Sequence, residues 1–140
     1  MTASPFPLLL AILGTVGYHL AQKSVPEGAA TFTVIAMAYL VGFGVAAGVM
    51  AVTGAPVAET MRLAWKPAVA LGLAALTIEV GYLLAYRAGW PVSTVSLIAN
   101  VAVAAVLLGV GLAVYREALT PAQWAGMGFC AVGLVLLFWR

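Results

Sequence analysis

Residues 68–85 read AVALGLAALTIEVGYLLA, an uninterrupted apolar run that contains a single charged side chain, Glu79. A helix of this length approaches the roughly 30 Å thickness of a bilayer's hydrocarbon core. A carboxylate at that depth costs roughly 2.5 to 3.5 kcal/mol on insertion scales, so it is retained only when it is paired, protonated or used. Glu79 is therefore the first candidate for a functional residue.

The composition of the whole chain predicts an integral membrane protein. Of its 140 residues, 65% are hydrophobic and 7% are charged, and the mean hydropathy is +1.14. A soluble globule of this composition would lack the polar residues to cover its surface. One cysteine excludes an intrachain disulfide, and one histidine without any aspartate leaves little material for a metal site. We expect no metal, no cofactor and, at a net charge of +2, no nucleic-acid partner.

Polar residues divide the chain into five apolar segments, each of about 17 to 25 residues and long enough to cross a membrane. The segments are 6–22, 29–52, 66–86, 91–115 and 121–138. They lack the alternation of barrel strands, so helices are expected. The connections are short, for example 53–62, and Thr120 before Pro121 predicts an N-cap followed by proline at the first helical position. The prediction is an all-α integral membrane protein, one domain over 1–140 with five transmembrane helices.

No basic residue precedes the first apolar segment, so we expect that helix to be retained and not cleaved as a signal peptide. Positive charges are shared equally between the two sides of such a five-span protein. The side of the N-terminus receives Arg62, Lys66 and Arg116, and the other side receives Lys23, Arg87 and Arg140. Since excess positive charge orients a membrane protein, the tie leaves two interpretations open. Either the chain inserts both ways and opposed copies pair as an antiparallel dimer, or packing or a partner fixes one orientation.

Two stretches in the second half of the chain follow a known pattern. Residues 85–100 read AYRAGWPVSTVSLIAN, and residues 116–126 read REALTPAQWAG ahead of a small-residue helix over 131–137. This order of helix, tight turn, helix, acidic-Leu-Thr turn and glycine-rich helix resembles the end of an EamA-type repeat of the drug/metabolite transporter superfamily. The resemblance runs from about Leu76 to the C-terminus, and the first two helices match only loosely.

The resemblance implies one half of a ten-helix transporter. Most members carry two repeats of opposite orientation, with the substrate at their interface near the midplane, so a single repeat needs a second copy. The related small multidrug resistance transporters are antiparallel homodimers with one membrane glutamate per subunit. Their glutamate lies in the first of four helices, whereas Glu79 lies in the third of five, which implies a similar role but not an equivalent position.

Glu79 shares a helix face with Tyr82 and Tyr86, three and seven residues further on. Tyrosine rings attract organic cations, and their hydroxyl groups can hold a carboxylate, so protons and a cationic substrate are expected to compete for Glu79. The alternative is a neutral Glu79 that only hydrogen-bonds another helix.

Three other features each have a functional interpretation and a packing interpretation, and the sequence does not decide between them. Asn100, the only asparagine, either faces the same cavity or joins helices at about 0.6 kcal/mol. His19, near the end of the first helix, is either a proton relay or an interfacial histidine. The small-residue stripe of Ala122, Gly126 and Cys130 makes the fifth helix the candidate dimer seam, by analogy with the last helix of the small multidrug transporters, or else serves ordinary close packing.

The sequence predicts a transporter and not an enzyme, because it has no serine with a histidine-acid pair, no spaced metal ligands and no phosphate loop. We expect secondary active transport of small organic molecules in a bacterial-type inner membrane, through proton-coupled export of cationic or amphipathic compounds. An antiparallel homodimer would work by alternating access. The alternative is a non-catalytic subunit of a heteromeric transporter, or a flippase for a lipid-linked substrate.

Overall fold

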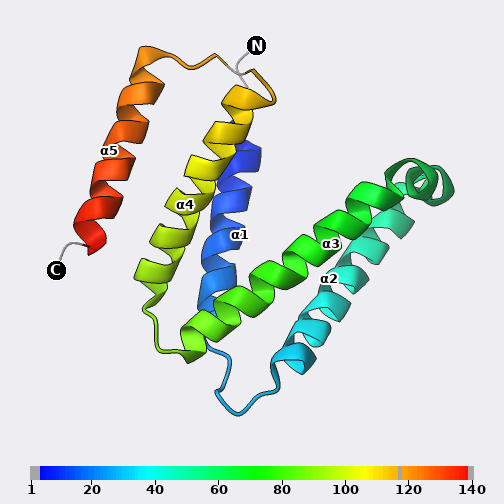
Figure 1. The fold of residues 1–140 in the computed structure, drawn as a ribbon. Helices are drawn as coiled ribbons and strands as arrows, with labels where there is room; N and C mark the ends of the chain where they lie inside the picture. The colour runs from blue at the N-terminus through cyan, green and yellow to red at the C-terminus, as the bar shows by residue number, and fades with distance from the viewer. Residues whose placement is uncertain (1–3, 117, 139–140) are drawn as a thin grey trace. The chain divides into compact units, whose positions relative to one another are not determined.

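The computed structural model describes residues 4–116 and 118–138, and over these residues the chain is all-α, as predicted. Five helices follow one another: α1 Phe6–Lys23, α2 Thr31–Thr53, α3 Val57–Arg87, α4 Val92–Ala113 and α5 Pro121–Phe138 (Figure 1). Three of them, α2, α3 and α4, are long and apolar enough to cross a membrane. The chain is thus a helical protein with several candidate transmembrane segments.

The helices form two compact units, Met1–Trp90 and Pro91–Arg140. In the first unit, α3 packs against both α1 and α2, and its C-terminal half crosses α1 near the end of that helix (Figure 1). In the second unit, α4 packs against α5. Two residues used in the predictions lie outside the described residues. They are Glu117, from the EamA-like pattern, and Arg140, one of the basic residues counted for the membrane orientation.

The predicted start of the third helix was wrong. The connection expected over 53–62 is confined to residues 54–56, because Gly54 adopts a φ of 64° and ends α2, and α3 begins at Val57 instead of residue 66. Glu59 lies in the first turn of α3, where a negative charge favours a helix N-terminus. Pro67 sits inside α3 without ending it. Charged residues and a proline therefore interrupted the apolar run but not the helix.

The C-terminal end of α3 is set by a glycine in a left-handed backbone conformation. Gly89 has a φ of 85° and its N–H donates to the Tyr86 carbonyl at 3.1 Å, while the Trp90 N–H donates to the Ala85 carbonyl at 3.2 Å. This Schellman motif ends α3 directly after Arg87.

The predicted N-cap of the fifth helix is confirmed and extended. The backbone N–H of Gln123 donates to the Thr120 hydroxyl oxygen at 3.3 Å, and the Gln123 side-chain oxygen accepts the Thr120 N–H at 2.8 Å. The two residues form a reciprocal capping box, with Pro121 at the first helical position.

The few buried positions of the first unit hold polar side chains beside the apolar Ile35 and Leu83. Its buried side chains include His19, 5% exposed, and Gln22, 7% exposed. Large apolar side chains on α2, such as Leu40 and Phe43, face outward. Polar groups turned inward and apolar groups turned outward are what a lipid environment requires, because acyl chains accept apolar side chains and cannot satisfy polar ones. The burial pattern thus agrees with a multi-pass membrane protein.

Candidate functional site

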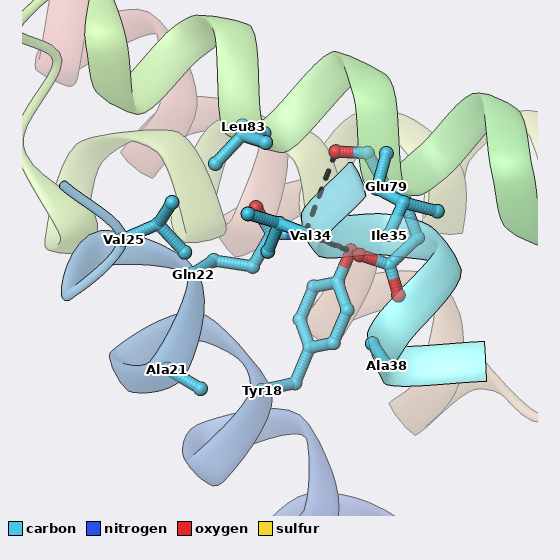
Figure 2. A pocket seen from close by; sticks show the side chains of 9 residues that line it. All are labelled: Tyr18, Ala21, Gln22, Val25, Val34, Ile35, Ala38, Glu79 and Leu83. Carbon is cyan, nitrogen blue, oxygen red and sulfur yellow. Dashed lines mark hydrogen bonds between the residues drawn. The ribbon is translucent and has the colours of Figure 1, made fainter. Parts of the chain in front are cut away.

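The carboxyl group of Glu79 is held by a glutamine from another helix. Gln22 Nε2 donates to Glu79 Oε2 at 2.5 Å and lies 3.4 Å from the Glu79 backbone carbonyl oxygen. The same nitrogen lies 3.0 Å from the hydroxyl oxygen of Tyr18. Figure 2 shows this hydroxyl beside the Glu79 carboxyl group. Glu79 is therefore embedded in a polar contact between α1 and α3, and not left alone in the apolar run.

The two α1 residues meet Glu79 because of their spacing. Tyr18 and Gln22 are four residues apart, so both project from one face of α1 in its last turns. The C-terminal half of α3 crosses α1 near the end of that helix (Figure 1), and the hydrogen bond from Gln22 places Glu79 against this face. Gln22 is buried, whereas Tyr18 and Glu79 are half-buried. The three side chains define what we call the Glu79 site.

The amide of Gln22 is only half satisfied. Its nitrogen has two hydrogens and three acceptors within reach, while its oxygen, Oε1, is buried without a partner. A buried carbonyl without a donor costs about 1 to 3 kcal/mol. The reversed amide would be worse, because it would place the carbonyl against the backbone oxygen and the carboxylate of Glu79, which only accept. The orientation in the structure is therefore the one that the neighbours of Gln22 select.

A cavity of about 140 Å³ opens at the Glu79 site. Side chains from α1, α2 and α3 line it, among them Tyr18, Gln22, Val34, Ile35, Glu79 and Leu83 (Figure 2). Three of these are polar and three are hydrocarbon walls. Drug-sized ligands occupy pockets of roughly 300 to 1,000 Å³, so this cavity alone holds only a small ligand or a small part of a larger one.

A second polar cluster lies one to two turns closer to the C-terminal end of α3. The Tyr86 hydroxyl and His19 Nδ1 share a hydrogen bond of 2.7 Å, and both residues are buried. The Tyr82 ring packs edge-on against the His19 ring, with 4.7 Å between the ring centres. It stacks on the Tyr86 ring, with 6.3 Å between the ring centres. Lys23 Nζ lies 5.8 Å from the centre of the Tyr86 ring. The face shared by Glu79, Tyr82 and Tyr86 is thus turned toward α1.

Arg87 joins the end of α3 to the start of α2. Its Nη1 donates to the Thr31 hydroxyl oxygen at 2.6 Å, and its Nη2 donates to the Ala29 carbonyl oxygen. No side chain caps the N-terminus of α2, so these bonds are what anchors that end. The third guanidinium nitrogen, Nε, is buried without a partner.

Asn100 belongs to the second unit. It is exposed on α4 and lines a separate cavity of about 410 Å³, whose walls include Leu108, Met127 and Cys130. Cys130, from the predicted small-residue stripe, is exposed and free. This cavity has Asn100 as its polar residue and apolar side chains elsewhere, so it differs in character from the Glu79 site.

Four of the predicted site residues, His19, Glu79, Tyr82 and Tyr86, therefore meet at the contact between α1 and α3. Sequence reasoning missed Tyr18 and Gln22, the direct neighbours of the Glu79 carboxyl group. The signal was present, because these two residues flank His19 and form a polar patch inside an otherwise apolar helix.

No protein-family model, curated protein or solved structure matches this chain. Within residues 4–116 and 118–138, no three side chains of His, Cys, Asp or Glu gather in a way that could hold a metal ion. The functional interpretation therefore rests on the chemistry of the site itself.

Proposed function

We propose that this protein is a secondary active transporter that exchanges small organic cations for protons at Glu79. The observation that carries the proposal is the place of this carboxyl group. It lies within an apolar helix of spanning length, at the polar end of a cavity formed by three helices. Intramembrane carboxyl groups are costly to keep, and most of those that persist line a substrate or proton pathway.

A single carboxyl group supports exchange because it holds either a proton or a cation. Loading of one ligand then disfavours the other, and alternating access carries each ligand across the membrane in turn. Gln22 and Tyr18 orient the carboxyl group, and the Tyr18 ring, which lines the same cavity, favours a cation. We assign the buried His19–Tyr86 pair to proton movement at the same contact.

We further propose that the functional unit is an EamA-like antiparallel homodimer in a bacterial-type inner membrane. The cavity of about 140 Å³ is smaller than a drug-sized ligand needs, which a second copy would remedy. Positive charges are balanced between the ends of the first unit, with Arg62 and Lys66 in the N-terminal part of α3 and Lys23 and Arg87 at the C-terminal ends of α1 and α3. Balanced ends favour insertion in both orientations. In the dimer, α5 would form the seam and Asn100 would shape the shared cavity.

One observation favours the alternative, a subunit or flippase that handles a lipid-linked substrate. The cavity of about 410 Å³ in the second unit is apolar and of a size that would accept part of an acyl chain. In that case Glu79 would be dispensable for activity. The same Glu79→Gln variant therefore separates the two functions.

The test is cation uptake into proteoliposomes that have an acidic interior. Each member of a series from methylammonium to tetramethylammonium is offered outside, and passive entry of the free amine is subtracted with protein-free vesicles. We expect the gradient to drive accumulation, Glu79→Gln to abolish it, and Glu59→Gln, on the exposed first turn of the same helix, to retain it. The proposal is contradicted if cation uptake does not depend on the proton gradient, or if the Glu79→Gln variant still accumulates the cation.

A further inference from the structure

The cavity at Glu79 lies between two helices whose backbones do not approach each other closely. Helices α1 and α2 both pack against α3, and within residues 4–116 and 118–138 they make no helix contact with each other. Side chains from all three helices line the cavity (Figure 2). The width of the cavity is therefore set by side chains that α1 and α2 contribute, and a substitution on either helix changes how large a ligand fits.

The two helices contribute different chemistry to the cavity. The lining side chains of α1 include Gln22, which bonds to the Glu79 carboxyl group, whereas those of α2 are all hydrocarbon. They are Val34, Ile35 and Ala38. In the part of the chain that the structure describes, no hydrogen bond joins α2 to Glu79. A change on α2 thus alters the shape of the cavity and leaves the partners of the carboxyl group in place.

Val34 and Ala38 form one wall of the cavity, which we call the α2 wall. They are four residues apart, so they lie one turn from each other on the same face of α2. Ile35 beside them is buried, Val34 is half-buried and Ala38 is exposed. Because the side chain of Ala38 is a single methyl group, the α2 wall leaves room at this position for part of a ligand.

The volume of the cavity limits what the α2 wall admits. In another protein, an apolar cavity of about 150 Å³ holds one benzene molecule. The cavity at Glu79, at about 140 Å³, accordingly accepts a group of similar size next to the carboxyl group. A tert-butyl group meets this limit. An adamantyl cage exceeds it and would have to push the α2 wall outward, and such overpacking is unfavourable.

We propose that the α2 wall is the size filter of the Glu79 site, with Ala38 as the residue that determines specificity. The filter admits cations whose group next to the charged nitrogen is no larger than a tert-butyl group. This inference rests on the proposed function, because it names the substrate class of the same site. A longer substrate can extend beyond the cavity, for example into a second copy of the chain, but the group next to its charge has to fit between α1 and α2.

The test compares tert-butylammonium with 1-adamantylammonium. Both cations carry a primary ammonium group on a tertiary carbon, so they have the same charge and the same N–H donors and differ in bulk. Methylammonium serves as a cation that is small enough to fit in every variant. Binding is measured by titration calorimetry on the full chain in lipid nanodiscs, and the heat of partition into protein-free nanodiscs is subtracted.

We expect wild-type protein to bind tert-butylammonium about tenfold or more tightly than 1-adamantylammonium. Ala38→Leu extends the α2 wall into the cavity, so it should weaken tert-butylammonium binding by about tenfold or more and methylammonium binding by about threefold or less. Ala36→Leu adds the same side chain two residues away, off this face of α2, and should bind every cation within about twofold of wild type.

A second variant changes the filter in the opposite direction. Val34→Ala removes the carbons beyond Cβ from the α2 wall, and it should strengthen 1-adamantylammonium binding by about threefold or more. A loss of fold cannot produce this gain in affinity.

The size limit is wrong if wild-type protein binds 1-adamantylammonium as tightly as tert-butylammonium. The role of the α2 wall is wrong if Ala38→Leu and Ala36→Leu bind tert-butylammonium equally well. In both cases cation binding at Glu79 stands. If Ala38→Leu also loses methylammonium, Val34→Ala decides, and an unchanged preference in that variant overturns the filter. If no cation binds wild-type protein, or if Glu79→Gln binds them normally, it is the proposed function that fails.

Discussion

The two helical units differ in what holds their helices together. In the first unit, polar side chains bond across helices, from Gln22 to Glu79, from Arg87 to Thr31 and between His19 and Tyr86. In the described part of the second unit, side-chain hydrogen bonds stay within α4 or within the cap of α5, and the space between these helices is apolar. Polar contacts are expensive to place in a membrane, and their concentration in one unit is the reason why we place the proposed exchange there.

The largest effect on stability is expected at the contact between α3 and α2. Arg87→Met removes the donors to the Thr31 hydroxyl and the Ala29 carbonyl, and bonds to a charged group contribute about 1.5 to 3 kcal/mol each. We expect the free energy of unfolding in mixed micelles to fall by about 3 to 6 kcal/mol, the sum over the two bonds. Arg62→Met, at an exposed position of the same helix, should stay within about 0.5 kcal/mol of wild type. Equal losses in the two variants would mean that the polar contact does not hold the first unit together.

A smaller effect is expected at the contact between His19 and Tyr86. In a double-mutant cycle of His19→Phe and Tyr86→Phe, the coupling free energy should be about 0.6 kcal/mol and at most about 1.7 kcal/mol, the range known for hydrogen bonds between membrane helices. The matched cycle of His19→Phe with Tyr39→Phe, on α2, should show no coupling. Equal coupling in both cycles would remove the specific role of the pair.

The smallest effect is expected in the second unit. Asn100→Ala should weaken tert-butylammonium binding by about threefold or less, which corresponds to the roughly 0.6 kcal/mol of an average membrane hydrogen bond. Gln22→Met should weaken it more than Asn100→Ala does, because Gln22 donates the hydrogen bond that orients the Glu79 carboxyl group. A loss in Asn100→Ala as large as that in Gln22→Met would erase the difference between the two units and make Asn100 a principal cation ligand.

The number of helices and the choice of Glu79 as a candidate residue both follow from local sequence. Apolar runs of spanning length fix the count, and a lone charge inside such a run is visible without a structure. The start of α3 was not predictable in this way, since hydropathy reports where a helix meets lipid and not where its hydrogen bonds begin. Gly54, which ends α2, was the better guide to that boundary.

The partners of Glu79 were harder to predict. Helix periodicity shows that Tyr82 and Tyr86 share its face, but it does not show which residues of another helix oppose that face. Tyr18 and Gln22 reach Glu79 because α3 crosses α1 near its C-terminal end, and the crossing point is set by side-chain packing along both helices. The polar patch on α1 indicated a contact, but only the fold identified the other side.

Proton release on cation binding addresses the role of Glu79 without any need for transport. Full-length protein in weakly buffered nanodiscs is titrated with tert-butylammonium at a series of pH values, and the released protons are counted with an indicator. If one carboxyl group holds either ligand, wild-type protein and Glu59→Gln should release up to about one proton per chain, and cation affinity should fall as the pH is lowered. Glu79→Gln should release none. Equal proton release by Glu79→Gln and wild-type protein would contradict exchange at this carboxyl group.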